Sequence, residues 1–157
     1  MKYRKFLLGT IIIFGFLSFI APVKADSAKR EKCYNSSLEE AVHMRAIQSR
    51  LMVAALSCEG AKARYNSFAI KFKTHLADNG KVLNSYFKCM AGKKSRHHMD
   101  KMITSIANIA ANMNSDDHES FCEEADEIFT ALEDIDTEEF GEVCSKHAFL
   151  NASILQK

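Results

Sequence analysis

The strongest constraint on the fold of this chain is a stripe of mostly apolar side chains spaced three or four residues apart between residues 61 and 91. Its members are Tyr65, Phe68, Phe72, Leu76, Asn79, Leu83, Tyr86 and Met90. This spacing places them on one face of an α-helix. The pair Asn79-Gly80 is typical of a turn, but the stripe keeps its phase on both sides. We therefore expect one kinked helix over 61–91, with two separate helices as the alternative.

Helical spacing recurs along the rest of the chain. A helix should begin at Ser37, whose hydroxyl and the carboxylate of Glu40 fit a capping box, and run to about Ser57. Residues 51–56 are apolar nearly all round, so we expect them to be the most buried segment. Further helices are predicted over about 96–113, from before Phe121 to about 134, and briefly after Thr137. The sequence thus predicts an all-α, disulfide-stapled bundle of about four main helices plus a short C-terminal helix.

The N-terminus has the pattern of an export signal. A short segment over 1–5, rich in lysine and arginine, precedes an uncharged run over 6–23. Val23-Lys24-Ala25 fits a cleavage site. Residues 1–25 are therefore predicted to be a signal peptide, leaving 26–157 as a single helical domain that is periplasmic or secreted. The apolar run is also about as long as the shortest membrane spans, so a retained anchor is the alternative. After cleavage we expect no membrane association.

Five cysteines in an exported chain predict two disulfides and one remaining thiol. If helix 61–91 is unbroken, Cys58 meets Cys122 at one end of the bundle. The second bridge must come from Cys33, Cys89 and Cys144. We expect Cys33–Cys144, which leaves Cys89 as the free thiol and as the route to a disulfide-linked dimer. A break at Gly80 would return Cys89 toward Cys58 and undo this scheme.

Charge is divided unevenly along the predicted mature chain. Residues 26–102 hold 15 basic and 7 acidic side chains, whereas residues 103–157 hold 2 and 13. The mature total is −3, which does not favour nucleic-acid binding. We expect the acidic late helices to lie beside the basic middle helix and neutralise it. A two-faced docking surface for a charged partner is the alternative.

Side chains that could bind a metal or a ligand are few. The soft donors His97, His98, Met99 and Met102, with His43 on another helix, form a copper candidate, but we expect core methionines and solvated histidines instead. Thiolates at these long spacings do not fit a zinc site. No catalytic constellation is recognised and no cofactor is expected. A small-ligand pocket could be lined by a set of core residues, namely Phe68, Phe72, Ile103, Ile106 and Phe129.

Three short motifs carry a family resemblance: residues 51–58 (LMVAALSC), Arg64-Tyr65-Asn66 followed by Phe68, and Phe121-Cys122. On these motifs the chain resembles, over about residues 46–132, a group of small exported bacterial helical proteins. The resemblance implies that Cys58 and Cys122 are a matched pair, in agreement with the geometric expectation. It implies no activity.

These observations favour a non-catalytic, exported envelope-accessory or protein-interaction module with a protein partner that the sequence does not identify. One alternative is a small-ligand or copper carrier of the cell envelope. A secreted effector is the other, and it differs from the first hypothesis only in location.

Overall fold

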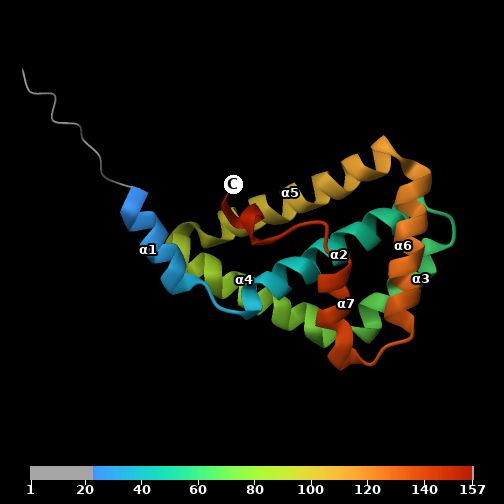
Figure 1. Cartoon of the computed structure of the whole chain (residues 1–157), viewed down its shortest axis with the longest axis horizontal. Helices are drawn as coiled ribbons and strands as arrows, with labels where there is room; N and C mark the ends of the chain where they lie inside the picture. The colour runs from blue at the N-terminus through green and yellow to red at the C-terminus, as the bar shows by residue number, and fades with distance from the viewer. Residues whose placement is uncertain (1–22, 157) are drawn as a thin grey trace, which may run out of the picture.

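The computed structural model describes residues 23–156, which are helical apart from short connections and contain no strand (Figure 1). The helices are α1 (Val23–Cys33), α2 (Ser37–Ser57), α3 (Ala61–Lys71), α4 (Lys73–Ala91), α5 (Ser95–Asp116), α6 (His118–Glu133) and α7 (Phe140–Lys146). Three 3-10 turns, η1 (Gly92–Lys94), η2 (Thr137–Glu139) and η3 (Ala152–Gln156), complete the set. The all-α bundle predicted from the sequence is confirmed, with α3 and α4 acting as one bent element.

The predicted signal peptide lies almost entirely outside the described residues. The predicted cleavage site at Val23-Lys24-Ala25 falls in the first turn of α1, a helix that the sequence analysis did not anticipate. None of the helices in residues 23–156 combines the length and the apolar character needed to cross a bilayer.

Helix α2 is the centre of the fold, because α3, α4, α5, α6 and α7 all pack against it. Its two faces belong to two different hydrophobic clusters. One face, with Ile47 and Leu51, joins side chains from α3, α6 and α7. The other face, with Leu38 and Val42, joins side chains from α4, α5 and η3. These four α2 residues have at most 1% of their surface exposed, so α2 is held from both sides.

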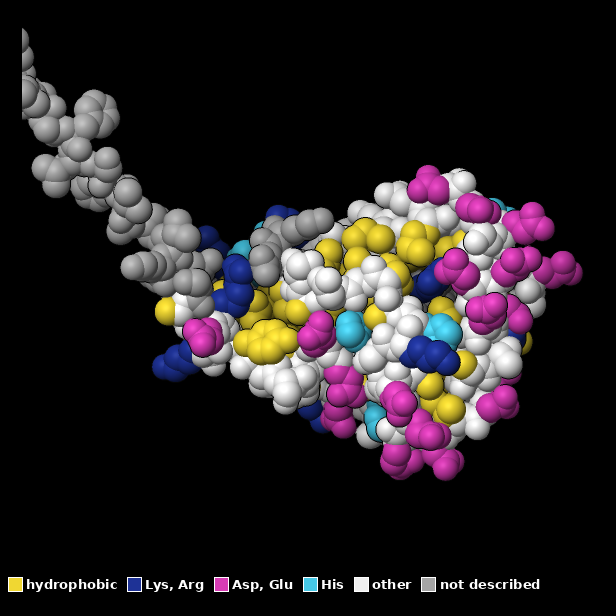
Figure 2. Space-filling view, viewed as in Figure 1, with side chains coloured by type: hydrophobic (Ala, Val, Ile, Leu, Met, Phe, Trp, Pro, Cys, Tyr) yellow, Lys and Arg dark blue, Asp and Glu magenta, His cyan; other side chains and the backbone are white. Residues whose placement is uncertain are grey.

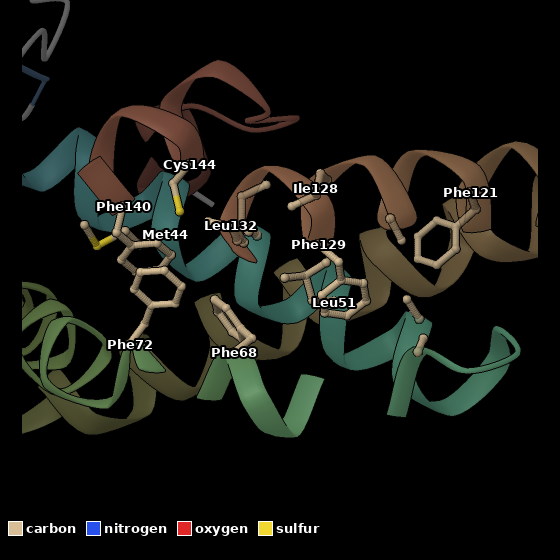
Figure 3. Close-up of a cluster of buried hydrophobic side chains, with 14 residues drawn as sticks. Met44, Leu51, Phe68, Phe72, Phe121, Ile128, Phe129, Leu132, Phe140 and Cys144 are labelled. Atoms are coloured by element: carbon tan, nitrogen blue, oxygen red, sulfur yellow. The ribbon is translucent and has the colours of Figure 1, made fainter. Parts of the chain in front are cut away.

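The first cluster is rich in aromatic rings (Figure 3). Phe72 and Phe140 stack with ring centroids 4.3 Å apart and planes inclined by 19°. Phe68 contacts both rings, and all three side chains are buried. Stacked rings of this kind add about 0.5–1.5 kcal/mol to the apolar burial. They fasten α7, which is only seven residues long, to the junction of α3 and α4.

The expected single helix over 61–91 bends at Phe72 and not at Gly80. Phe72 has φ −101° and ψ 14°, yet its amide still donates to Phe68 and its carbonyl still accepts from Leu76. Gly80 lies inside α4, where a β-carbon would come within 3.8 Å of the guanidinium of Arg45. That distance is an ordinary van der Waals contact, and Gly80 has no positive φ, so the helix continues through Gly80 without a turn.

Two local expectations for α2 are wrong. Ser36 precedes the helix, and Ser37 Oγ donates to Asn35 Oδ1 (3.3 Å), so the capping box with Glu40 does not form. Leu56 is 85% exposed rather than buried. Leu56 is 18 residues, or five helical turns, beyond Leu38 and so lies on the same face of α2. The α2 members of the second cluster all lie between residues 38 and 46, so this face is left uncovered at its C-terminal end.

Two disulfides staple the helices. Cys58–Cys122 joins the end of α2 to the second turn of α6, which confirms the expected pair. The expected Cys33–Cys144 bridge is wrong, because Cys33 pairs with Cys89. Helix α4 continues unbroken to Cys89 and delivers it beside α1. Cys89 is therefore not the free thiol, and a dimer linked through it is not available to this fold.

Cys144 is the free thiol and is fully buried. Helix α7 docks against the first half of α2, where Gly141 lies against Glu40 and His43 Nδ1 lies 3.1 Å from Ser145 Oγ. This placement turns Cys144 into the first hydrophobic cluster, away from Cys33. Two disulfides suggest an oxidising, extracytoplasmic environment for the folded protein.

Alkylation should distinguish the cysteines. Burial raises the pKa of the Cys144 thiol, so the reactive thiolate is scarce in the folded state. We expect the folded, unreduced protein to resist iodoacetamide and the unfolded, unreduced protein to gain one label at Cys144, measured by peptide mass spectrometry. Label on Cys89 without reduction would contradict the observed pairing.

Asn79 provides a test of the α2–α4 contact. It is 4% exposed, donates to the carbonyl of Ala41 and accepts from Arg45 Nη2 (3.0 Å). Asn79→Ala leaves buried polar groups without partners and should lower the free energy of unfolding by about 1–3 kcal/mol in urea denaturation. Asn84→Ala, on the same helix, should change it by less than about 0.5 kcal/mol. Equal effects would show that the Asn79 hydrogen bonds do not hold this contact.

Candidate functional site

Opposite charges gather at opposite ends of the molecule (Figure 2). We call the exposed carboxylates between residues 116 and 142, carried by the end of α5, α6, η2 and α7, the acidic end. We call the cations of α1, the end of α4, η1 and the start of α5 the basic end. Its members are Lys29, Arg30, Lys32, Lys88, Lys93, Lys94 and Arg96. Helix α5 alone has 22 residues and separates the two ends by about 33 Å.

The basic end is held together by specific contacts. The Cys33–Cys89 bridge joins α1 to the last turn of α4. Lys29 Nζ donates to the carbonyl of Met90 (2.7 Å), which places a cation at the C-terminus of that helix, where the helix dipole favours it. The concentration of positive charge is therefore a consequence of how α1 is fastened.

Neutralisation between the acidic and basic helices, which the sequence analysis expected, is limited. Within residues 23–156 the ion pairs that reach the acidic end come from two arginines. Arg50 pairs with Glu124, and Arg64 pairs with Asp126 and Glu133. Most of the acidic end keeps its charge exposed to solvent. The expected adjacency is confirmed, because α6 packs beside α3, the first half of the predicted basic helix. The expected neutralisation is incomplete, because the ion pairs leave most carboxylates of this end without a paired cation.

Arg64 clamps α3 to α6. Its Nε donates to Glu133 Oε1 (2.7 Å), its Nη2 donates to Thr130 Oγ1 (3.0 Å), and its guanidinium lies 5.1 Å from the centre of the Phe129 ring. The hydrogen bond from Arg64 lowers the pKa of the Glu133 carboxyl and outweighs the opposing effect of burial. Three of the contacts reach successive turns of α6, so Arg64 fixes the register of the two helices.

A cavity of about 670 Å³ opens beside the Cys58–Cys122 bridge, between the start of α3 and α6. Glu59, Glu123 and Glu127 contribute carboxylates to its wall. His118 lies one turn before Cys122, with both ring nitrogens 3.8 Å from the sulfur. The cavity is strongly acidic, and the exposed side chain of Leu56 is two residues before Cys58. This end of the molecule therefore combines negative charge, a hollow and an apolar side chain.

The copper candidate does not assemble. His97 and His98 are exposed at the basic end, Met102 is buried in the second cluster, and Met99 packs against that cluster. His43 faces α7, where it contacts Ser145. The part of the chain that the structure describes contains no group of three or more His, Cys, Asp or Glu side chains placed to hold a metal ion.

The residues expected to line one core pocket lie in two different clusters. Phe68, Phe72 and Phe129 belong to the first cluster, whereas Ile106 belongs to the second and Ile103 packs against it. Helix α2 separates the two sets. The three phenylalanines line only a small space of about 100 Å³.

Sequence reasoning missed Arg50. It is 4% exposed, lies over the rings of Phe121 and Phe149, and pairs with Glu124. An arginine directly before the apolar run 51–56 was the available signal. Helical spacing alone does not show that both neighbouring faces of α2 are covered at this point.

Comparison with known proteins gives no further guidance, because no family model, curated protein or solved structure matches this chain.

The Arg64 clamp predicts a pH-dependent contribution to stability. The folded-state pKa of Glu133 is lowered, so the ionised carboxylate stabilises the folded state above the ordinary pKa near 4.5. This stabilisation is lost as pH falls through the lowered pKa. Glu133 is half-exposed, so Glu133→Gln should cost less than about 1 kcal/mol at neutral pH.

Thermal denaturation from neutral pH down to pH 2 measures the difference in the free energy of unfolding between Glu133→Gln and the wild type. It should shrink below about pH 4.5. Glu123→Gln removes an exposed carboxylate of the same helix that has no ion pair within the described residues, and serves as the control. A difference that persists unchanged to pH 2 would contradict the assignment.

Proposed function

We propose that this protein is an exported, non-catalytic interaction module of the cell envelope, periplasmic or secreted, whose acidic end docks a basic partner protein. The observation that carries the proposal is the separation of opposite charges to the two ends of one rigid bundle. A charged surface of one sign steers a partner of the other sign and aligns it before contact.

The carboxylates available for docking are those that the fold does not use. Glu119, Glu123 and Glu142 are exposed and make no ion pair within residues 23–156. They come from the beginning of α6, its second turn and α7. A partner that meets all three must present several cations over a broad area, which favours a folded basic protein over a small cation.

An apolar anchor supports the same surface. Leu56 is 85% exposed, and Met52, one turn earlier on α2, is 40% exposed. Both lie close in sequence to Cys58, which is bridged to α6 beside the acidic cavity. Interfaces commonly combine an apolar centre with a charged rim. Burial of Leu56 by a partner would contribute about 1.5–3 kcal/mol, and the surrounding carboxylates would supply specificity.

Of the alternatives, copper transport is not supported, because its candidate donors lie on separate parts of the fold. An effector role would use the same docking surface at another location. Recovery of the protein from culture medium, rather than from the periplasm, would favour it.

Photo-crosslinking tests the docking surface. The protein carries a photo-reactive residue at position 56 or, as a matched control, at position 70, where Ile70 is 72% exposed on α3. We expect one adduct with a basic protein from position 56 and none from position 70, measured by mass spectrometry of the envelope fraction. Raising the salt concentration from about 0.05 M to about 0.5 M should reduce its yield several-fold.

Charge variants supply the second control. Combining Glu119→Gln and Glu123→Gln should abolish the adduct from position 56. Combining Glu31→Gln and Asp100→Asn removes equal charge at the basic end and should leave it intact. No adduct, equal adducts from both positions, or an adduct that survives the first double variant would refute the docking proposal.

A further inference from the structure

A second cavity, of about 350 Å³, lies on another side of α6 and does not include the disulfide. It is bounded by the end of α5, the middle of α6 and the segment that follows α7, with α2 behind it. Four charged side chains line it: Arg50 and Lys146, and Glu124 and Glu127. Figure 2 shows a recessed Lys or Arg side chain bordered by carboxylates on this face.

Arg50 lies at the floor of this cavity. Its side chain is 5% exposed, and its guanidinium carbon is 5.4 Å from the centre of the Phe121 ring and 5.6 Å from that of Phe149. A guanidinium has five N–H donors. Glu124 accepts from Nη2, and Nε has no acceptor among the described residues. Nε is enclosed by protein, so the guanidinium meets the cavity through its other nitrogens.

The cavity is lined by charged groups of both signs. Glu124 is half-exposed and uses one oxygen for Arg50, which leaves its other oxygen available. Glu127 and Lys146 are exposed and form no ion pair within the described part of the chain. A ligand with a single charge would leave one set of these groups without a counter-charge. A ligand that carries both charges would complement the cations and the carboxylates together.

Apolar groups form most of the rest of the wall, which His147 and Ala148 complete. Met113 from α5, Ile128 from α6 and Phe149 after α7 line the cavity beside the charged groups. Its volume is at the lower end of the range for small-molecule sites. The combination of a buried guanidinium, neighbouring carboxylates and an apolar wall matches the parts of an apolar amino acid.

We propose that this cavity binds a free α-amino acid with an apolar side chain. Arg50 and Lys146 receive its carboxylate, since a guanidinium fork and a carboxylate form strong charge-assisted hydrogen bonds. Glu124 and Glu127 receive its ammonium group, and Met113, Ile128 and Phe149 contact its side chain. The site shares Glu127 with the acidic cavity and borders the docking surface. Its test uses a small molecule and no partner protein, so either proposal can fail without the other.

The test is a titration of the whole exported protein with L-leucine, monitored by calorimetry and by amide chemical shifts. Two analogues test the two charged groups of leucine separately: 4-methylpentanoate lacks the amino group, and 3-methylbutylamine lacks the carboxylate. We expect saturable binding of leucine, shifts around residues 124–128 and 146–149, and binding about tenfold or more weaker for each analogue. Inorganic phosphate is the probe for a simple anion site.

Two exposed variants report on the site without disturbing buried Arg50. Lys146→Gln and Glu127→Gln should each weaken leucine binding about tenfold. Lys94→Gln and Glu138→Gln, which lie outside the cavity, should leave it unchanged. No saturation by about 10 mM leucine, equal binding of 4-methylpentanoate or phosphate, or insensitivity to both cavity variants would overturn the proposal.

Discussion

Enclosure of α2 from two sides is the constraint on which the rest of this structure depends. A bundle helix usually buries one stripe and leaves the opposite face to water. Here Leu38 and Val42 face one cluster and Ile47 and Leu51 face another. The bend at Phe72 makes this possible, because it lets α3 and α4 follow different sides of the same helix. The two clusters do not merge, which is why the phenylalanines and isoleucines expected to share a pocket lie apart.

The same enclosure decides where charge can be tolerated. Arg50 lies between the two faces and is buried with aromatic rings and one carboxylate as neighbours. Arg64 lies nearer the surface and is satisfied by three side chains of α6. Arg45 is partly buried between α2 and α4, where it donates to Gln48 and Asn79. Most other charges are exposed, and they concentrate at the two ends. A small protein thus keeps a strong electrostatic asymmetry without burying more than a few ionic groups.

Sequence reasoning recovered the features that depend on local periodicity. The all-helical fold, both ends of the helix from Ser37 to Ser57, and the Cys58–Cys122 pair follow from spacing and helix length. Sequence reasoning failed for features that are set by tertiary contacts, such as a helix break or the burial of one side chain. Gly80 was suspected of breaking a helix because Asn-Gly pairs favour turns, and the sequence does not show that Asn79 is held by hydrogen bonds to α2. Leu56 was expected to be buried because an apolar run does not reveal where its covering helix ends.

The Cys33–Cys144 bridge was expected for a related reason. Helix lengths placed Cys33, Cys89 and Cys144 in one half of the bundle without distinguishing them. The position of α7 decides which cysteine pairs with Cys33. The contact of Gly141 with Glu40 and the stacking of Phe140 on Phe72 hold α7 against the middle of the fold, so Cys144 does not reach Cys33. Neither contact has a signature in the sequence, and the buried Arg50 was missed for the same reason.

The two disulfides have an interleaved order along the chain. If the chain enters an oxidising compartment N-terminus first, as the proposed export requires, Cys33 and Cys58 arrive before Cys89 and Cys122, so its first two thiols are not native partners. Oxidation in order of appearance would join them wrongly. Helix α2 prevents this once it has formed, because its 21 residues hold the two sulfurs about 30 Å apart, far beyond bonding distance. The central helix therefore acts as a spacer that preserves both early thiols for partners that arrive later.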